Sequence, residues 1–167
     1  QSSHRQKPID WLIYTSALPA DHPELLMAKK LGIRASKRHE FINHVAEKNN
    51  LKLVGVAGTH GKTTTTSMLV WALQQLKVPV SYCIGATLSF GPSGRFEKGS
   101  QYFVFECDEY DRSFLNFKPF LSVIISIDYD HPDIYPTIDD YLSAFHQFAS
   151  LSSQVITWGD QHKEIFA

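Results

Sequence analysis

The stretch Leu53-Val54-Gly55-Val56-Ala57-Gly58-Thr59-His60-Gly61-Lys62-Thr63-Thr64 decides the fold of this chain. Its first five residues are apolar or glycine, a pattern typical of a buried strand. Gly58 to Gly61 predict a tight turn, because glycine adopts backbone conformations that residues with a Cβ resist. From Lys62 to Leu76 the sequence favours a helix. The apolar stripe of that helix would be Met68, Leu69, Ala72, Leu73 and Leu76.

A strand, a glycine turn and a helix in this order predict a phosphate-binding loop, or P-loop. The free N–H groups and the positive dipole end of the helix attract an anion. Lys62 would contact the β- and γ-phosphates of a nucleotide, and the Thr63 hydroxyl would bind Mg²⁺. The predicted nucleotide-binding residues are Gly58, Thr59, His60, Gly61, Lys62, Thr63 and Thr64.

The spacing of the loop differs by one residue from the common pattern Gly-x4-Gly-Lys-Ser/Thr. Val56 stands five places before Gly61, and Gly55 lies one place too early. The physical requirements of the pattern are still met, since a strand, a glycine turn, Lys-Thr and a helix follow one another. The difference argues against a generic nucleoside-triphosphatase assignment.

Outward from the loop, strand and helix patterns alternate. Strands are predicted over 78–84, 102–106, 121–127 and 154–158, with a polar loop over 91–100. A helix follows Thr137, which with Asp140 forms an approximate capping box. Its apolar stripe would be Ile138, Tyr141, Leu142, Phe145, Phe148 and Ala149. The alternation predicts an α/β fold, with a mostly parallel, doubly wound sheet and helices on both faces.

The first 48 residues form a separate pattern. A strand is predicted over 11–15 and helices over 24–31 and 38–48, which together resemble the end of a Rossmann-like α/β domain. We expect residues 1–48 to be the C-terminal part of one domain and residues 49–167 to be most of a second. The chain begins without Met, and we expect it to have been excised from a longer protein.

Two acidic runs follow predicted strands, namely 106–111 (Glu-Cys-Asp-Glu-Tyr-Asp) and 128–133 (Asp-Tyr-Asp-His-Pro-Asp). Ligands of open α/β sheets bind at the carboxyl ends of the strands, where these runs would meet the glycine loop. A divalent cation would offset the repulsion between carboxylates and phosphate. We predict Thr63, Glu106 and His131 as metal ligands. A neutral imidazole such as His131 can also orient a phosphoryl oxygen.

Composition excludes several classes of function. The 167 residues carry a formal net charge of −1, which gives no electrostatic case for nucleic acid or an anionic membrane. No apolar run approaches the roughly 20 residues of a membrane span, and residues 1–7 do not read as a signal peptide. Cys83 and Cys107 form neither a disulfide framework nor a zinc motif. We expect a cytoplasmic protein with buried thiols.

The loop and both acidic runs resemble motifs of the Mur ligase family. Residues 58–64 are similar to its ATP loop, residues 106–115 to its Glu-Ala-Asp-Glu-Ser-Asp-x-Ser-Phe motif, and residues 126–135 to its Asn-Ile-Asp-x-Asp-His-x-Asp-x-Tyr motif. Tyr14-Thr15-Ser16-Ala17 followed by His22-Pro23-Glu24 resembles the end of its UDP-binding N-terminal domain. Three motifs in the right order, over nearly the whole chain, are specific for this family.

The resemblance implies an ATP-dependent amide ligase of peptidoglycan biosynthesis. ATP would phosphorylate the carboxylate of UDP-N-acetylmuramate, and an amine, L-alanine first among the candidates, would attack the acyl phosphate. Lys62 would stabilise the transferring phosphoryl group. Thr63 and Glu106 would hold one Mg²⁺, and His131 would help to hold a second. Lys62 and His131 are therefore the predicted catalytic residues.

The sequence also departs from the family pattern. Ser126 replaces the usual Asn, and no Lys occurs between Lys118 and Lys163, where several relatives carry a carbamylated lysine. The second departure is like the alanine-adding branch. The family has three domains, and the Gly-rich UDP loop and the amino-acid-binding C-terminal domain are absent from these residues. We therefore expect this chain alone to have no ligase activity.

Three alternatives remain open from the sequence. The Glu-Tyr-Asp version of the acidic motif also occurs in the murein-tripeptide recycling ligase, which joins a tripeptide to the same sugar nucleotide. A small P-loop kinase would need arginines in a lid near the phosphates, and the region after the loop offers mainly Arg95 and Arg112. A nucleotide-binding switch without chemistry would need loops that order differently with different nucleotides.

Overall fold

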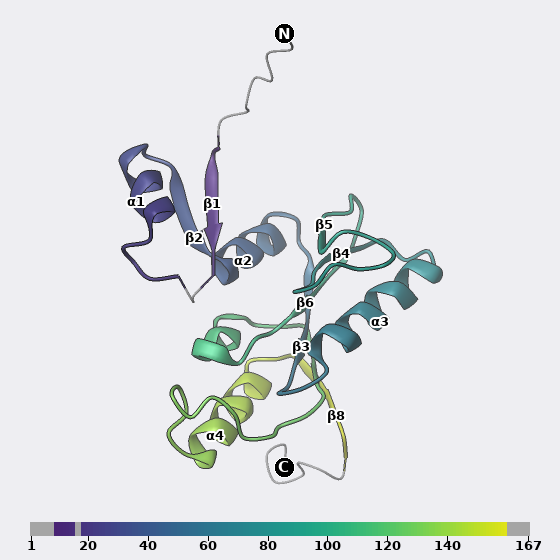
Figure 1. The fold of residues 1–167 in the computed structure, drawn as a ribbon. Helices are drawn as coiled ribbons and strands as arrows, with labels where there is room; N and C mark the ends of the chain where they lie inside the picture. Colours follow the sequence, from purple (N-terminus) through teal and green to yellow (C-terminus); the bar gives the residue numbers. More distant parts are fainter. Residues whose placement is uncertain (1–8, 16–17, 160–167) are drawn as a thin grey trace. The chain divides into compact units, whose positions relative to one another are not determined.

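The computed structural model describes residues 9–15 and 18–159 (Figure 1). The N-terminal segment 1–7, Ser16 and Ala17 of the UDP-domain motif, and the end of the predicted second domain over 160–167 lie outside the described residues. The chain divides into two compact units, with the boundary between His44 and Val45. Among the described residues, no helix combines the length and the apolar character that crossing a membrane requires.

The first unit contains a small parallel sheet. Strand β1 (Trp11–Tyr14) pairs with β2 (Arg34–Lys37), and α1 (Pro23–Lys30) connects them. Helix α2 (Arg38–Lys48) follows directly and crosses the boundary between the units. The guanidinium of Arg34 stacks over the Trp11 ring at 3.6 Å. The prediction of one strand and two helices was therefore incomplete, because it omitted β2.

The second unit is built on a six-stranded sheet of strand order β5-β4-β6-β3-β7-β8. Every neighbouring pair is parallel except β4 and β5, which are antiparallel. In chain order the elements are β3 (Lys52–Ala57), α3 (Lys62–Gln75), β4 (Val80–Cys83), β5 (Gly94–Arg95), β6 (Tyr102–Glu106), the 3-10 helix η1 (Tyr110–Asn116), β7 (Leu121–Ile124), α4 (Ile138–Ser150) and β8 (Gln154–Thr157). The short strand β5 lies inside the predicted polar loop.

The two long helices of this unit cover opposite faces of the sheet (Figure 1). From β3 the chain passes through α3 to β4 on one side, whereas the connection from β7 through α4 leads to β8 on the other side. Crossovers between parallel strands are right-handed, so connections that run in opposite directions place their helices on opposite faces. The predicted doubly wound, mostly parallel sheet is confirmed. Strand β3 lies where the direction reverses, which is where such sheets bind ligands.

The face under α3 is packed with aliphatic side chains. The buried cluster consists of Val54, Val70, Val80, Tyr82, Ile84 and Val104. The predicted stripe on α3 was partly wrong, because Met68 and Leu76 are 65% and 73% exposed, whereas Thr66 and Val70 are buried. Thr66 is tolerated inside because its hydroxyl donates to the Lys62 carbonyl oxygen at 2.7 Å.

The opposite face is aromatic. Phe114 lies 5.2 Å from Phe145 and 4.9 Å from Phe148, so the rings of η1 and α4 pack against each other. Helix α4 begins where predicted, since the Thr137 hydroxyl accepts from the Asp140 N–H at 3.1 Å. Ile138 of its predicted stripe is 54% exposed. Gly55 of β3 borders this layer, because a Cβ there would lie 2.6 Å from the Cys107 sulfur and 3.6 Å from the Phe148 ring.

Candidate functional site

The loop after β3 is shaped by two glycines with positive φ. Gly58 has a φ of 139°, and a Cβ there would lie 2.9 Å from the backbone N and O of Ser126. Gly61 has a φ of 80° and is the N-cap of α3 in the left-handed conformation. Both conformations are rare for residues with a side chain. The two glycines therefore let the loop turn tightly against β7 and enter the helix without a capping side chain.

The first turn of α3 presents backbone donors to the loop. The Thr65 N–H donates to the Gly61 carbonyl oxygen at 2.9 Å, which is the first hydrogen bond of the helix. The N–H groups of Lys62, Thr63 and Thr64 precede that bond and therefore have no acceptor within the helix. Gly61 offers no side chain to cap them. Three N–H groups without an acceptor in the helix, at its positive end, are an arrangement that favours the binding of an anion.

The middle of the loop is braced by the segment after β7. The N–H of Thr59 donates to the Ser126 carbonyl oxygen at 3.1 Å, and the N–H of His60 donates to the Ser126 hydroxyl at 2.9 Å. The Thr59 hydroxyl lies 2.8 Å from the Asp128 carbonyl oxygen and 2.8 Å from the Tyr141 hydroxyl. We had predicted Thr59 and His60 as nucleotide ligands. Here their N–H groups hold the loop in shape.

Lys62 is held by an ion pair with Glu109. Its ammonium lies 2.8 Å and 3.0 Å from the two carboxylate oxygens of Glu109, and it donates to the Gly58 carbonyl oxygen at 2.7 Å. The side chain of Lys62 is 17% exposed and that of Glu109 only 1%. Lys62 therefore connects the glycine loop to the acidic run after β6.

Glu109 is enclosed by the protein on all sides. Burial raises the pKa of its carboxyl group, while the hydrogen bond and the charge of Lys62 act in the opposite direction. The Tyr135 hydroxyl donates to the backbone oxygen of Glu109 at 2.6 Å. Burial also raises the pKa of Tyr135 to about 12, so this donor stays protonated at neutral pH. Glu109 thus lies at the centre of the three polar segments.

Glu106 lies at the solvent side of the same strand end. Its carboxylate accepts from the Thr63 hydroxyl at 3.2 Å and from the Gly85 N–H at 3.0 Å. Thr63 is exposed and Glu106 is half-buried. Hydroxyl and carboxylate oxygens are the ligands that Mg²⁺ prefers, and this ion keeps several of its waters. The pair predicted to bind the first metal ion is therefore close together and open to solvent.

His131 lies next to Glu109. Its Nε2 is 3.9 Å from the Glu109 Oε1 and 3.7 Å from the Asp130 Oδ2. Its backbone has a φ of 57°, and its ring packs edge-on against Tyr110 at 5.2 Å. Within residues 9–15 and 18–159, no three His, Cys, Asp or Glu side chains form a group that could hold a metal ion. The role of His131 as a metal ligand stays a prediction.

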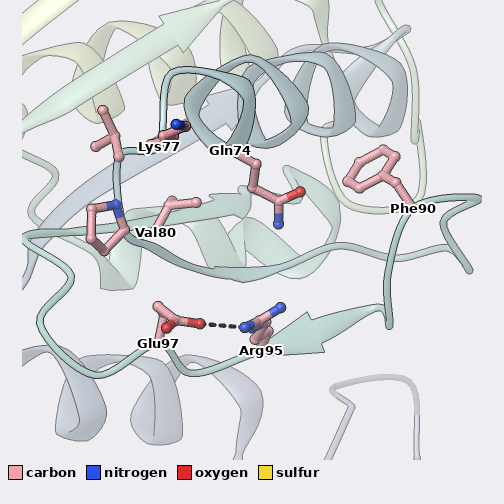
Figure 2. A pocket seen from close by; sticks show the side chains of 8 residues that line it. Gln74, Lys77, Val80, Phe90, Arg95 and Glu97 are labelled. Atoms are coloured by element: carbon pink, nitrogen blue, oxygen red, sulfur yellow. Dashed lines mark ion pairs between the residues drawn. The ribbon is translucent and has the colours of Figure 1, made fainter.

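Two of the hollows formed by the described residues lie near α3. One, of about 400 Å³, adjoins Thr63 and Thr64 and is lined further by Ser67, Met68, Trp71 and residues 86–90. The other, of about 390 Å³, lies beyond the C-terminal end of α3, next to β4 and β5. Figure 2 shows that Gln74, Phe90 and the Arg95–Glu97 ion pair line the second hollow. Only the first hollow borders the phosphate loop.

Sequence reasoning missed Glu109, Tyr135 and Tyr141 as members of the site. Glu109 belongs to an acidic run in which Glu106 was the expected ligand, and nothing local distinguishes the two. The two tyrosines lie 26 and 32 residues further along the chain. A hint was available, because a loop lysine next to a predicted acidic cluster requires a counter-charge.

Comparison with known proteins agrees with this geometry. Residues 56–167 match the Mur ligase middle domain. The chain is 43% identical over 155 residues to the UDP-N-acetylmuramate–L-alanine ligase of Salinispora arenicola, covering 91% of this chain and 30% of that protein.

Two solved structures share the fold. The UDP-N-acetylmuramate–alanine ligase of Thermotoga maritima superposes with a TM-score of 0.77 at 28% identity, over 93% of this chain and 36% of that one. The UDP-N-acetylmuramate:L-alanyl-γ-D-glutamyl-meso-diaminopimelate ligase of Neisseria meningitides gives a TM-score of 0.75 at 24% identity, over 94% and 55%. The chain spans about a third of the length of the curated relatives it matches. By its matched middle domain, the chain belongs to the Mur ligase family.

Proposed function

We propose that this chain provides the ATP-binding part of an amide ligase that joins L-alanine to UDP-N-acetylmuramate through an acyl phosphate. The observation that carries the proposal is the anion site at the start of α3, which has Lys62 beside it and lies at the reversal point of the sheet. The names of the similar proteins supply the substrates. The geometry supports phosphate binding and does not by itself select an amine.

The residues of the loop have distinct proposed roles. The N–H groups of Lys62, Thr63 and Thr64 would bind the phosphate oxygens, and Gly58 and Gly61 would allow the backbone to approach them closely. The Lys62 ammonium would stabilise negative charge on the transferring phosphoryl group. We retain Thr59 and His60 as members of the nucleotide-binding segment, acting through the shape of the loop.

A magnesium ion would be held by Thr63 and Glu106. When bound, it would neutralise charge on the phosphates, which the carboxylates of this site would otherwise repel. The chain's own contribution is to hold the two oxygen ligands 3.2 Å apart at the surface, where water can complete the coordination shell. His131 would hold a second ion or orient a phosphoryl oxygen near Glu109.

We assign residues 1–48 to the end of a UDP-substrate-binding domain and residues 49–167 to the central ATP-binding domain. This assignment gives neither unit a site for the amino acid. We therefore expect the 167-residue chain to bind nucleotide without forming an amide. Phosphate release in the presence of ATP, UDP-N-acetylmuramate and L-alanine measures this, and robust turnover by the chain alone would contradict the domain assignment.

A recycling ligase that attaches a tripeptide is the second candidate. The observation in its favour is the equally extensive fold match to the Neisseria enzyme. In a complete protein carrying this chain, the two functions differ only in the amine. Comparing L-alanine with L-alanyl-γ-D-glutamyl-meso-diaminopimelate as the acceptor separates them.

Nucleotide binding is the direct test of the phosphate site. Isothermal titration with ATP, ADP and GTP should show a preference for the adenine nucleotides. The matched pair of variants is Glu109→Gln and Lys62→Met/Glu109→Gln, which differ only at Lys62 and leave no unpaired buried carboxylate in either protein. We expect the second variant to bind ADP at least about tenfold more weakly than the first, since it lacks a hydrogen bond from a charged group. Equal affinities would exclude Lys62 from the phosphate site.

A further inference from the structure

We propose that Glu109 is the resident counter-ion of Lys62 and that it lowers the affinity of the loop for phosphate. This inference rests on the proposed function of the loop, and it adds an affinity-determining residue that lies outside the predicted ligand set. A bound nucleotide would have to share the Lys62 ammonium with the carboxylate of Glu109, which is part of the protein. The loop would then hold ADP less tightly than its backbone donors and lysine alone would allow.

The first support is the geometry of the ammonium. A lysine ammonium has three donors, and here Lys62 contacts the Gly58 carbonyl oxygen and both carboxylate oxygens of Glu109. The Thr59 carbonyl oxygen lies 3.4 Å away as a weaker acceptor. An incoming phosphate oxygen must therefore compete with Gly58 and Glu109 for an N–H of the Lys62 ammonium.

The second support is the burial of Glu109. Its side chain is 1% exposed, so water screens its charge poorly, and the turn that carries it is fixed through the Tyr135 hydroxyl. Like charges held close together repel strongly near a protein surface, because the effective dielectric constant there is well below that of bulk water. Lys62 offsets this repulsion only partly once its charge is divided between two anions. Removing the carboxylate should therefore strengthen anion binding.

Asp108 provides a matched control for this charge effect. It directly precedes Glu109, but its side chain is exposed, and its Oδ1 accepts from the Tyr110 N–H at 3.2 Å. Neutralising Asp108 removes the same formal charge from a position where solvent screens it. Glu109 faces Lys62 and His131, which the substitution leaves unchanged; the charge of Asp108 also acts on the pKa of Glu109, but less than burial and Lys62 do.

The experiment is isothermal titration of the chain and its Glu109→Gln and Asp108→Asn variants with ADP at low ionic strength. We expect Glu109→Gln to bind ADP about tenfold more tightly, because the phosphates of ADP then no longer share the Lys62 ammonium with a buried carboxylate. The gain should shrink as salt is added, since salt screens the charge of bound phosphate. Asp108→Asn should stay within about twofold of the unchanged chain.

A gain in affinity distinguishes this role from a purely structural one, because a damaged fold weakens binding or leaves it unchanged. Unchanged or weaker binding of ADP by folded Glu109→Gln overturns the proposal. If that variant does not fold, Glu109→Met takes its place, because it removes the same charge, and the partner left behind, Lys62, is 17% exposed and so reaches water. The same gain is expected from it.

A failure of the proposed ligase function can be distinguished from a failure of the counter-ion proposal. If the unchanged chain binds neither ATP nor ADP, the ligase proposal falls. The counter-ion is then tested with inorganic pyrophosphate by thermal shift. A larger pyrophosphate-induced rise in Tm for Glu109→Gln than for Asp108→Asn supports the counter-ion role, and equal rises exclude it.

Discussion

Glu106 and Glu109 follow the same strand, three residues apart, and they occupy opposite environments. Glu106 faces solvent and pairs with the Thr63 hydroxyl, whereas Glu109 is buried and pairs with the Lys62 ammonium. Glu106 is the last residue of β6, whereas Glu109 is the N-cap residue of the 3-10 helix η1, and its backbone oxygen accepts from the Tyr135 hydroxyl. One acidic run therefore supplies a surface ligand for a cation and an internal charge for the phosphate loop.

The difference implies that the neighbouring residues Lys62 and Thr63 contribute unequally to the stability of the fold. Breaking the Lys62–Glu109 pair removes the partner of a buried charge, which is expensive. Breaking the Thr63–Glu106 pair exposes both groups to water, which costs little. Substitutions in the Lys62–Glu109 pair should consequently affect stability, whereas substitutions in the Thr63–Glu106 pair should affect metal binding.

The largest effect is expected from Lys62→Met. Glu109 then has no counter-charge, and removing one partner of a buried ion pair typically costs 3–5 kcal/mol, so we expect a loss of about 3 kcal/mol in the free energy of unfolding. Urea denaturation followed by circular dichroism measures it. The double variant Lys62→Met/Glu109→Gln should recover most of the loss, and an equally unstable double variant would show that the ion pair is not the cause.

A smaller effect is expected from Glu106→Gln, and it falls on metal binding. We expect its free energy of unfolding to change by at most about 0.5 kcal/mol, because the amide oxygen of Gln can still accept from the Gly85 N–H and the lost pair involves the exposed Thr63 hydroxyl. The gain in ADP affinity that the unchanged chain shows on adding Mg²⁺ should fall about tenfold, because an ionised ligand is lost. Titrations with Mg²⁺ and with EDTA give both values. A full magnesium effect in Glu106→Gln would remove Glu106 from the predicted ligands.

The smallest effect is expected from Tyr135→Phe. This substitution removes the hydroxyl that donates to the Glu109 backbone oxygen at 2.6 Å and keeps the ring. We expect a loss of about 1 kcal/mol in the free energy of unfolding, which is typical of one hydrogen bond. Tyr110→Phe, at an exposed position, is the control and should be near neutral. Equal stabilities of the two variants would mean that the hydroxyl does not hold the Glu109 turn.

Local patterns in the sequence predicted the parts of the site that depend on local structure. The glycine turn, the start of α3 and the Thr137 cap are each specified by residues within a few positions of one another. Strand β2 was not predictable in this way. Its sequence Arg-Ala-Ser-Lys has no apolar alternation, and it becomes a strand only by pairing with β1. Tertiary pairing outweighs local preference there.

The environment of Glu109 was also beyond local reasoning. Its burial depends on the turn at η1, where Asp111 and Arg112 both adopt positive φ, and on Tyr135, which arrives from the segment after β7. Leu69 and Leu73 of the stripe predicted on α3 do pack against the core, and the errors at Met68 and Thr66 have a related cause. Thr66 looks polar in a sequence, but a hydroxyl bonded to its own helix is compatible with the interior. Met68 lines a surface hollow instead.

The close approach between Gly55 and Cys107 has a consequence for how this sequence can vary. A Cβ at residue 55 would lie 2.6 Å from the Cys107 sulfur, so the two positions share one volume between the central strands and the aromatic layer. A library randomised at residue 55 alone should return glycine, whereas one that also varies residue 107 could exchange Gly-Cys for a pair such as Ala-Gly. Substitutions at residues 55 and 107 would then occur together.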